Sequence, residues 1–211
     1  MIKGTIFDLD GTLVDSMWIW DNIGEAYLRS LEIEPRENLA ETFKTFTLEQ
    51  AAEYYREHYG VTLSVNEIVD GVNKMVAEIY RTKVTLKSGV REFLETLKSY
   101  DIKMCVATVT DRPIVEDVLV NLGIRDFFSG IFTCAEVGYN KETPHIYRAA
   151  LKALGTKKDE TVVFEDALHA LITAKKDGFM VAAVYDRHER NQTQMKENGD
   201  YYITDFKTTK I

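Results

Sequence analysis

Residues 5–15 of this 211-residue chain read Thr-Ile-Phe-Asp-Leu-Asp-Gly-Thr-Leu-Val-Asp. A short run of β-branched and apolar residues ends here in two carboxylates, Asp8 and Asp10, and Gly11 follows them. β-Branched and apolar residues favour a strand, and glycine lets the backbone turn sharply after it. The stretch therefore predicts a strand whose exit loop brings two acidic side chains close to one point.

Similar apolar runs recur along the chain, and helical patterns lie between most of them. The further runs cover residues 102–107, 130–133, 161–164, 180–184 and 201–204. Apolar residues at three- to four-residue spacing, typical of helices, occur in 90–97, 114–122 and 146–154. Alternating strands and helices predict an α/β fold with a parallel, doubly wound sheet and right-handed crossovers.

Residues 15–82 break this alternation and read as consecutive helices. We expect helices over 17–31, 48–58 and 66–81, with a shorter piece near 35–46. Thr47 and Gln50 have the spacing of a helix-capping box. An insert after the first strand lies at the carboxyl edge of the sheet, where ligands bind in open α/β folds. We therefore expect two domains, a core of residues 1–14 and 83–211 and an all-helical cap of residues 15–82.

Composition and charge exclude several classes of partner. The formal net charge is −8, which argues against a general affinity for nucleic acid, because that needs a clustered basic face. No segment approaches the ~20 apolar residues of a membrane span, so we expect no membrane partner. Two cysteines are too few for a disulfide framework, and we expect a reducing, cytoplasmic setting. The oligomeric state is left open.

The string Asp8-Leu9-Asp10-Gly11-Thr12 resembles motif I, D-x-D-G-T, of the haloacid-dehalogenase (HAD) superfamily. The resemblance implies a Rossmann-like core and gives Asp8 the role of nucleophile, which becomes an aspartyl-phosphate. It implies that Asp10 donates a proton to the leaving oxygen and later takes one from water, while its backbone carbonyl helps to hold a metal. A carboxylate suits the first role because it needs no deprotonation, and a covalent intermediate divides one displacement into two.

Two further motifs of the family supply groups for the phosphoryl oxygens. Motif II places a Ser or Thr at the end of the second core strand, where Thr108 is the first choice and Thr110 the alternative. Motif III, in its K-x-x-P-x-x-[FY] form, matches Lys141, Pro144 and Tyr147. A lysine there can neutralise both the nucleophile and the phosphoryl group.

A fourth motif implies a magnesium site. Glu165 and Asp166 end the apolar run of residues 161–164 and resemble motif IV. Mg²⁺ prefers oxygen ligands, usually one or two carboxylates together with phosphate and water. The resemblance thus implies Mg²⁺ as cofactor, held by Asp8, the Asp10 carbonyl, Asp166 and Glu165.

The match is best to the subgroup with a helical cap between motifs I and II, which includes β-phosphoglucomutase-like and phosphoglycolate-phosphatase-like enzymes. Lys87-Ser88-Gly89-Val90 also matches, except that Ser88 replaces the commoner proline. Two residues after motif IV depart from the usual D-S-x-x-G: Ala167 removes a hydroxyl near the metal, and Ala170 replaces a glycine that packs between helices. His169 is expected at the surface or behind the metal ligands.

The resemblance implies a Mg²⁺-dependent phosphatase acting on a small phosphorylated metabolite. Two alternatives stay open, a phosphomutase of the β-phosphoglucomutase type and a non-catalytic HAD-fold binding protein. Dehalogenase chemistry is disfavoured because it does not need the magnesium ligands. The aromatic residues of the first two cap helices, Trp18, Trp20, Tyr27, Tyr54, Tyr55 and Tyr59, form either the core of the cap or a pocket there.

Overall fold

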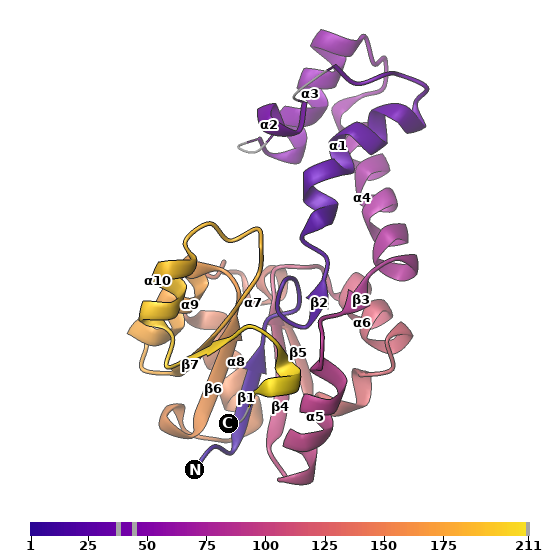
Figure 1. Cartoon of the computed structure of the whole chain (residues 1–211). Helices are drawn as coiled ribbons and strands as arrows, with labels where there is room; N and C mark the ends of the chain where they lie inside the picture. The colour runs from indigo at the N-terminus through magenta and orange to yellow at the C-terminus, as the bar shows by residue number, and fades with distance from the viewer. Residues whose placement is uncertain (37–38, 44–45, 210–211) are drawn as a thin grey trace. The chain divides into compact units, whose positions relative to one another are not determined.

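A computed structural model describes residues 1–36, 39–43 and 46–209 (Figure 1). The chain separates into two compact units, one of residues 1–16 and 84–211 and one of residues 17–83. The first unit is the α/β core and the second is the helical insert. Among the described residues, no helix has both the length and the apolar character needed to cross a membrane.

Six strands of the described chain form one parallel sheet in the core, in the order β5-β4-β1-β6-β7-β8. Their bounds are β1 Gly4–Phe7, β4 Lys103–Thr108, β5 Gly130–Thr133, β6 Thr161–Glu165, β7 Met180–Val184 and β8 Tyr201–Ile203. The predicted doubly wound fold is thus confirmed. The strand order changes direction between β1 and β6, and such a switch point opens a crevice at the carboxyl ends of the strands.

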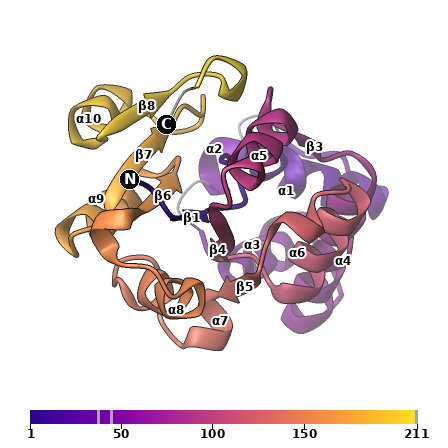
Figure 2. The same ribbon diagram turned by 90° about the horizontal axis from the view of Figure 1, so that it is seen from below.

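The two faces of the sheet are covered by different helices (Figure 2). On one face, alternate strand residues such as Ile6 and Val163 join a buried cluster with α8 (His145–Leu154), α9 (Leu168–Lys176) and α10 (Gln192–Asn198). On the other face Phe7 and Phe164 stack with ring centroids 4.3 Å apart, and Phe93 of α5 (Val90–Ser99) packs edge-on against both. Burial on both sides explains why β1 and β6 read as continuous apolar runs.

The remaining core elements are short or lie in the crossovers. They are α6 Arg112–Asn121, α7 Cys134–Val137, and the 3-10 turns η1 Arg125–Phe127, η2 Lys158–Glu160 and η3 Phe206–Thr208. Two more strands, β2 (Val14–Asp15) and β3 (Thr85–Leu86), pair antiparallel in a separate ribbon. The ribbon holds together the segments by which the chain leaves the core and returns to it.

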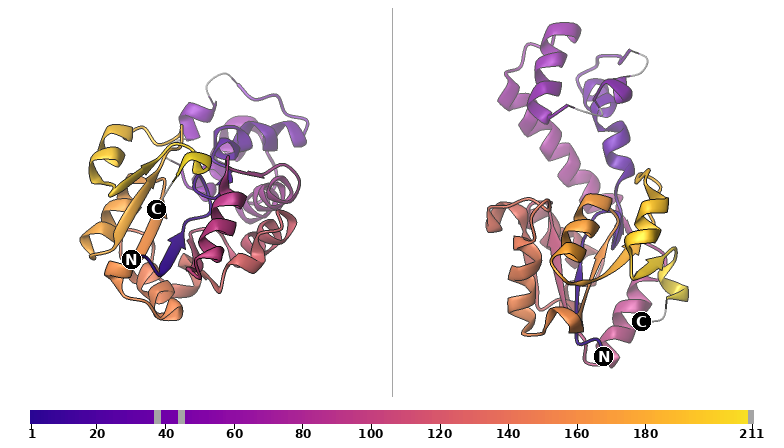
Figure 3. Two further views of the ribbon diagram at one scale, coloured as in Figure 1. Left: turned by 60° about the horizontal axis from the view of Figure 1, so that its bottom comes forward. Right: turned by 90° about the vertical axis from the view of Figure 1, so that its left-hand side faces the viewer.

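The insert contains α1 Trp18–Ser30, α2 Leu39–Phe43, α3 Leu48–Tyr59 and α4 Val65–Thr82, which pack on one another (indigo to purple in Figure 3). Thr47 and Gln50 form the expected capping box at the start of α3, and Ser64 and Glu67 form a second one at α4. Within the piece expected near 35–46, residues 37–38 and 44–45 lie outside the described residues.

Candidate active site

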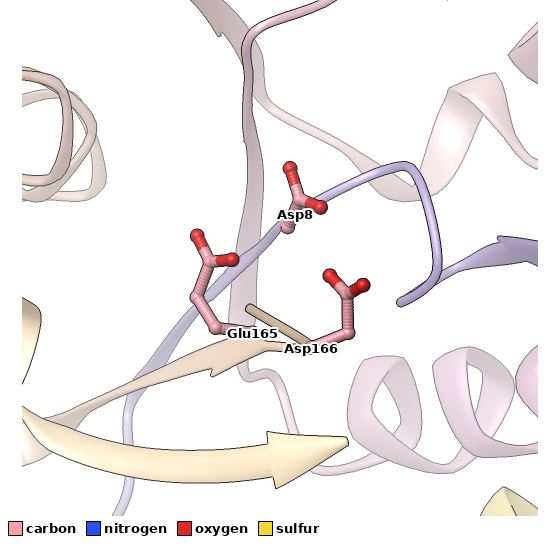
Figure 4. A group of neighbouring side chains, drawn as sticks. All are labelled: Asp8, Glu165 and Asp166. Atoms are coloured by element: carbon pink, nitrogen blue, oxygen red, sulfur yellow. The ribbon is translucent and has the colours of Figure 1, made fainter. Parts of the chain in front are cut away.

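Three buried carboxylates gather where β1 and β6 end (Figure 4). Asp8 follows β1 directly, Glu165 is the last residue of β6, and Asp166 comes next in the chain. Each offers one oxygen, and these oxygens lie within 4.8 Å of one another. The parallel register explains the meeting, because Phe7 pairs with Phe164 and the residues that follow both leave the sheet at the same edge.

Lys141 supplies positive charge to this cluster. Its side chain is 5% exposed, and its ammonium group donates to Asp8 Oδ1 and, at 2.8 Å, to Glu165 Oε1. The loop between α7 and α8 carries the lysine, and Pro144 ends that loop at the N-cap position of α8. Proline is tolerated at a helix start because no intrahelical hydrogen bond needs its missing N–H, and Lys141 precedes it by three positions.

Burial and crowding of like charges shift the pKa values of these groups. Burial raises the pKa of Asp8 well above its usual range, Lys141 opposes the rise, and the neighbouring carboxylates Glu165 and Asp166 add to it. Burial raises the pKa of Asp166 to about 7, again with help from Glu165. Burial alone would lower the pKa of Lys141, but Asp8 and Glu165 together raise it. One ammonium group therefore faces more negative charge than it neutralises.

Asp10 is held by two hydroxyl groups. Ser16 Oγ donates to its Oδ1 and Thr110 Oγ1 donates to its Oδ2, each at 2.6 Å. Gly11, with φ of +72°, turns the backbone immediately afterwards, and Thr12 Oγ1 donates to Asp166 Oδ1 at 3.3 Å. The loop after β1 thus orients its own acid and also contacts the acid that follows β6.

Thr108 and Thr110 take different places at the end of β4. Thr108 is fully buried, and its Oγ1 accepts a hydrogen bond from the backbone N–H of Thr110 at 3.1 Å. The hydroxyl hydrogen of Thr110 is committed to Asp10. Since an accepting hydroxyl keeps its own hydrogen for another partner, this arrangement favours Thr108 as the group able to donate to a ligand.

The structure joins further residues to the site that sequence reasoning did not select. Tyr147 donates to Glu165, and Ser16 donates to Asp10. Lys87 Nζ donates to the Gly11 carbonyl at 2.6 Å and to buried Asp186 at 2.9 Å, and so ties the loop after β1 to the segment after β7. Tyr147 stood in motif III and Lys87 in the match that opens α5, but neither pattern states what the polar atom contacts.

The departures after motif IV have a local compensation. Ala167 is the N-cap residue of α9 and cannot accept a hydrogen bond through its side chain. Glu189, from the segment after β7, accepts from the Leu168 backbone N–H at 3.0 Å and so pairs one of the free N–H groups at the helix start. His169 is exposed. Glu189 therefore compensates in part for the missing N-cap side chain, but it does not replace a hydroxyl near the metal.

The aromatic residues of the insert divide between core and cavity wall. Tyr27 and Tyr55 are buried and pack with ring centroids 6.0 Å apart, whereas Trp20 is 47% exposed. A cavity of about 560 Å³ within the insert is lined partly by Trp20, Phe43 and Tyr55. The insert thus contains both a buried aromatic core, with Tyr27 and Tyr55, and a cavity, with Trp20 in its wall.

Comparison with known proteins identifies the family. The family model for haloacid dehalogenase-like hydrolases matches residues 5–184. Hexitol phosphatase B of Escherichia coli is 26% identical over 176 residues, covering 82% of this chain and 79% of that protein. A phosphorylated carbohydrates phosphatase of Thermotoga maritima is 28% identical over 189 residues, covering 84% and 82%.

Among solved structures, the β-phosphoglucomutase of Clostridium difficile superposes with a TM-score of 0.73 at 19% identity, covering 100% of this chain and 94% of that one. At this identity the likeness shows the fold alone. The family match, in contrast, covers the sheet from β1 to β7 and the insert, and leaves out only β8 among the strands of the described sheet. It includes the four acidic or basic side chains that meet at the site: Asp8, Lys141, Glu165 and Asp166. The chain belongs to the haloacid dehalogenase-like hydrolase family.

Proposed function

We propose that this protein is a Mg²⁺-dependent phosphatase that hydrolyses a small phosphomonoester through an aspartyl-phosphate on Asp8. One observation carries the proposal: the Asp8 carboxylate lies buried beside two further carboxylates and is hydrogen-bonded to a buried lysine. A carboxylate nucleophile needs a nearby cation to approach an anionic phosphoryl group, and Lys141 provides one.

The donor set fits Mg²⁺. Asp8, Glu165 and Asp166 offer only oxygen, the ligand type that Mg²⁺ prefers, and one lysine does not neutralise them. We expect Asp8, Asp166, Glu165 and the Asp10 carbonyl to hold the ion. When bound, it supplies positive charge against the phosphoryl oxygens.

The chain's own residues account for the two half-reactions. Asp8 attacks phosphorus, the bond from phosphorus to the leaving oxygen breaks, and Asp10 donates a proton to that oxygen. Asp10 then takes a proton from water as the water oxygen attacks the phosphoryl group, which releases phosphate and restores Asp8. Ser16 and Thr110 orient the Asp10 carboxyl for both transfers, and Thr108 is suited to donate to the phosphoryl group.

The named relatives support a phosphorylated sugar or polyol as the substrate class. Their names describe phosphatases of hexitol phosphates and of phosphorylated carbohydrates. The same names favour a phosphatase over a phosphomutase, while the intact set of Asp8, Asp10 and Lys141 argues against a non-catalytic binding protein. We therefore infer that water, rather than a second sugar hydroxyl, resolves the aspartyl-phosphate.

The test is phosphate release from a panel of sugar and polyol phosphates with Mg²⁺ present. We expect release from several members and a loss of at least about 1,000-fold in Asp8→Asn, because an amide is a poor nucleophile of similar volume. Absence of release by the wild-type protein from every member would refute the phosphatase.

A second assay separates phosphatase from phosphomutase. The protein is incubated with a hexose 1-phosphate and a trace of the corresponding bisphosphate, and both the 6-phosphate and free phosphate are measured. Free phosphate as the main product supports the proposal. Rapid conversion to the 6-phosphate with little free phosphate would establish the mutase instead.

A further inference from the structure

Tyr147 places a hydroxyl group inside the acidic cluster. The residue lies in α8, is fully buried, and donates to Glu165 Oε1 at 2.7 Å. Lys141 Nζ donates to the same oxygen at 2.8 Å and also to Asp8. A single carboxylate oxygen of Glu165 therefore joins the tyrosine to the lysine that contacts the nucleophile.

The ring and the hydroxyl of Tyr147 have separable roles. The ring belongs to the apolar cluster between the sheet and α8 to α10, where it meets Phe179 edge-on with centroids 6.3 Å apart. A phenylalanine ring would fill this space equally well, and the motif accepts Phe or Tyr at this position. Packing thus requires an aromatic residue but does not require the hydroxyl.

The hydroxyl instead constrains Glu165. A glutamate side chain has three rotatable bonds, and a single hydrogen-bond donor does not fix all of them. Two donors on Oε1, arriving from different segments, fix the direction of the carboxylate.

We propose that Tyr147 is a positioning residue, whose hydroxyl holds Glu165 so that the Lys141 ammonium group is directed at Asp8. The effect that we expect on catalysis rests on the proposed phosphatase function. The hydrogen bond from Tyr147 to Glu165 does not depend on it. With Oε1 occupied by the two donors, Oε2 would be the Glu165 oxygen available to a cation held with Asp8 and Asp166. The Tyr147 hydroxyl donates to Glu165 and not to the nucleophile, so its effect on Asp8 passes through Glu165 and Lys141.

The test compares Tyr147→Phe with Tyr202→Phe. Tyr202 is half-buried against the same apolar cluster and donates to a side-chain oxygen, Gln192 Oε1, at 2.9 Å, but it belongs to β8 at the far edge of the sheet. We expect kcat to fall about tenfold or more in Tyr147→Phe, as for a lost hydrogen bond to a charged group, with KM changed less than twofold. Tyr202→Phe should keep both constants within twofold of wild type.

A second readout does not depend on turnover. In ¹⁵N-lysine-labelled protein the protected ammonium group of Lys141, identified by its loss in Lys141→Met, should shift in Tyr147→Phe and stay in place in Tyr202→Phe. An unmoved signal, or kcat within twofold of wild type, overturns the positioning role. If the wild-type protein releases no phosphate at all, the proposed function fails, and the ammonium signal alone still decides the inference.

Discussion

Replacing Asp166 with asparagine should make the metal-free protein more stable at alkaline pH. The folded protein raises the pKa of Asp166 from its ordinary 3.8 to about 7, chiefly by burial. A carboxyl with a raised pKa favours folding while it is protonated, and that contribution is lost as the pH rises through about 7. At pH 8 the wild-type protein therefore buries a charge that asparagine, of similar volume, does not carry.

The structure sets the size of the effect. One pH unit corresponds to about 1.4 kcal/mol, so the interval from 3.8 to about 7 corresponds to at most about 4 kcal/mol. Asp8 shares the same crowded surroundings and competes for the proton, which makes this an upper limit. Thr12 donates to an Asp166 oxygen that asparagine can also present, so the substitution removes charge with little loss of contact.

The assay is urea unfolding in EDTA at pH 8 and at pH 5, followed by circular dichroism. The free energy of unfolding of Asp166→Asn should exceed that of the wild-type protein at pH 8. The difference between the two proteins should be smaller at pH 5. Asp177→Asn is the matched control. Hydrogen bonds from Arg148 and Lys158 lower the pKa of Asp177, so its stabilising contribution is present at neutral pH and lost on acidification. Asp177→Asn should therefore have a lower free energy of unfolding than the wild-type protein at pH 8.

An Asp166→Asn variant as stable as wild type, or less stable, at pH 8 in EDTA would contradict this prediction, provided that Asp177→Asn behaves as expected. That result would mean that the carboxylate of Asp166 is already compensated without a cation. It would remove the electrostatic argument for a bound metal at this point.

Two further predictions concern the metal and the loop after β1. Excess chelator should abolish phosphate release, and full activity in chelator would contradict this. Added Mg²⁺ should raise the unfolding midpoint of the wild-type protein at pH 8 but not that of Asp166→Asn, because only a protein that binds the ion is stabilised by it. Lys87→Met should lower the free energy of unfolding by about 3 kcal/mol, since it leaves buried Asp186 without its ammonium partner. The Lys87→Met/Asp186→Asn double variant should recover part of that loss in urea unfolding, and no recovery would show that the pair is not coupled.

Much of the fold could be predicted because its signals are local. The apolar run of residues 161–164 predicted the strand β6, and the start of α3 carries a complete capping box within four residues. The order of the strands was not predicted, and the meeting of Asp8 and Asp166 was expected only because their strings resemble motifs I and IV.

The rest depends on contacts that leave no pattern in the sequence. Strands β2 and β3 contain two residues each, too few for an alternation to show. Thr110 and Asp10 are separated by 100 positions, and Lys87 and Asp186 by 99, so only the folded chain brings their polar atoms together. The role of the Tyr147 hydroxyl was hidden for another reason, because the motif treats Phe and Tyr as equivalent.

The most direct test of the central claim is to trap the intermediate on Asp8. Wild-type protein is mixed with a substrate that releases phosphate, quenched in acid within one turnover, reduced with borohydride and digested for mass spectrometry. An acyl phosphate is reduced to the alcohol, so we expect homoserine at position 8, present only when substrate and Mg²⁺ were both added. Turnover with unmodified Asp8, or homoserine at Asp10 or Asp166 instead, would contradict it.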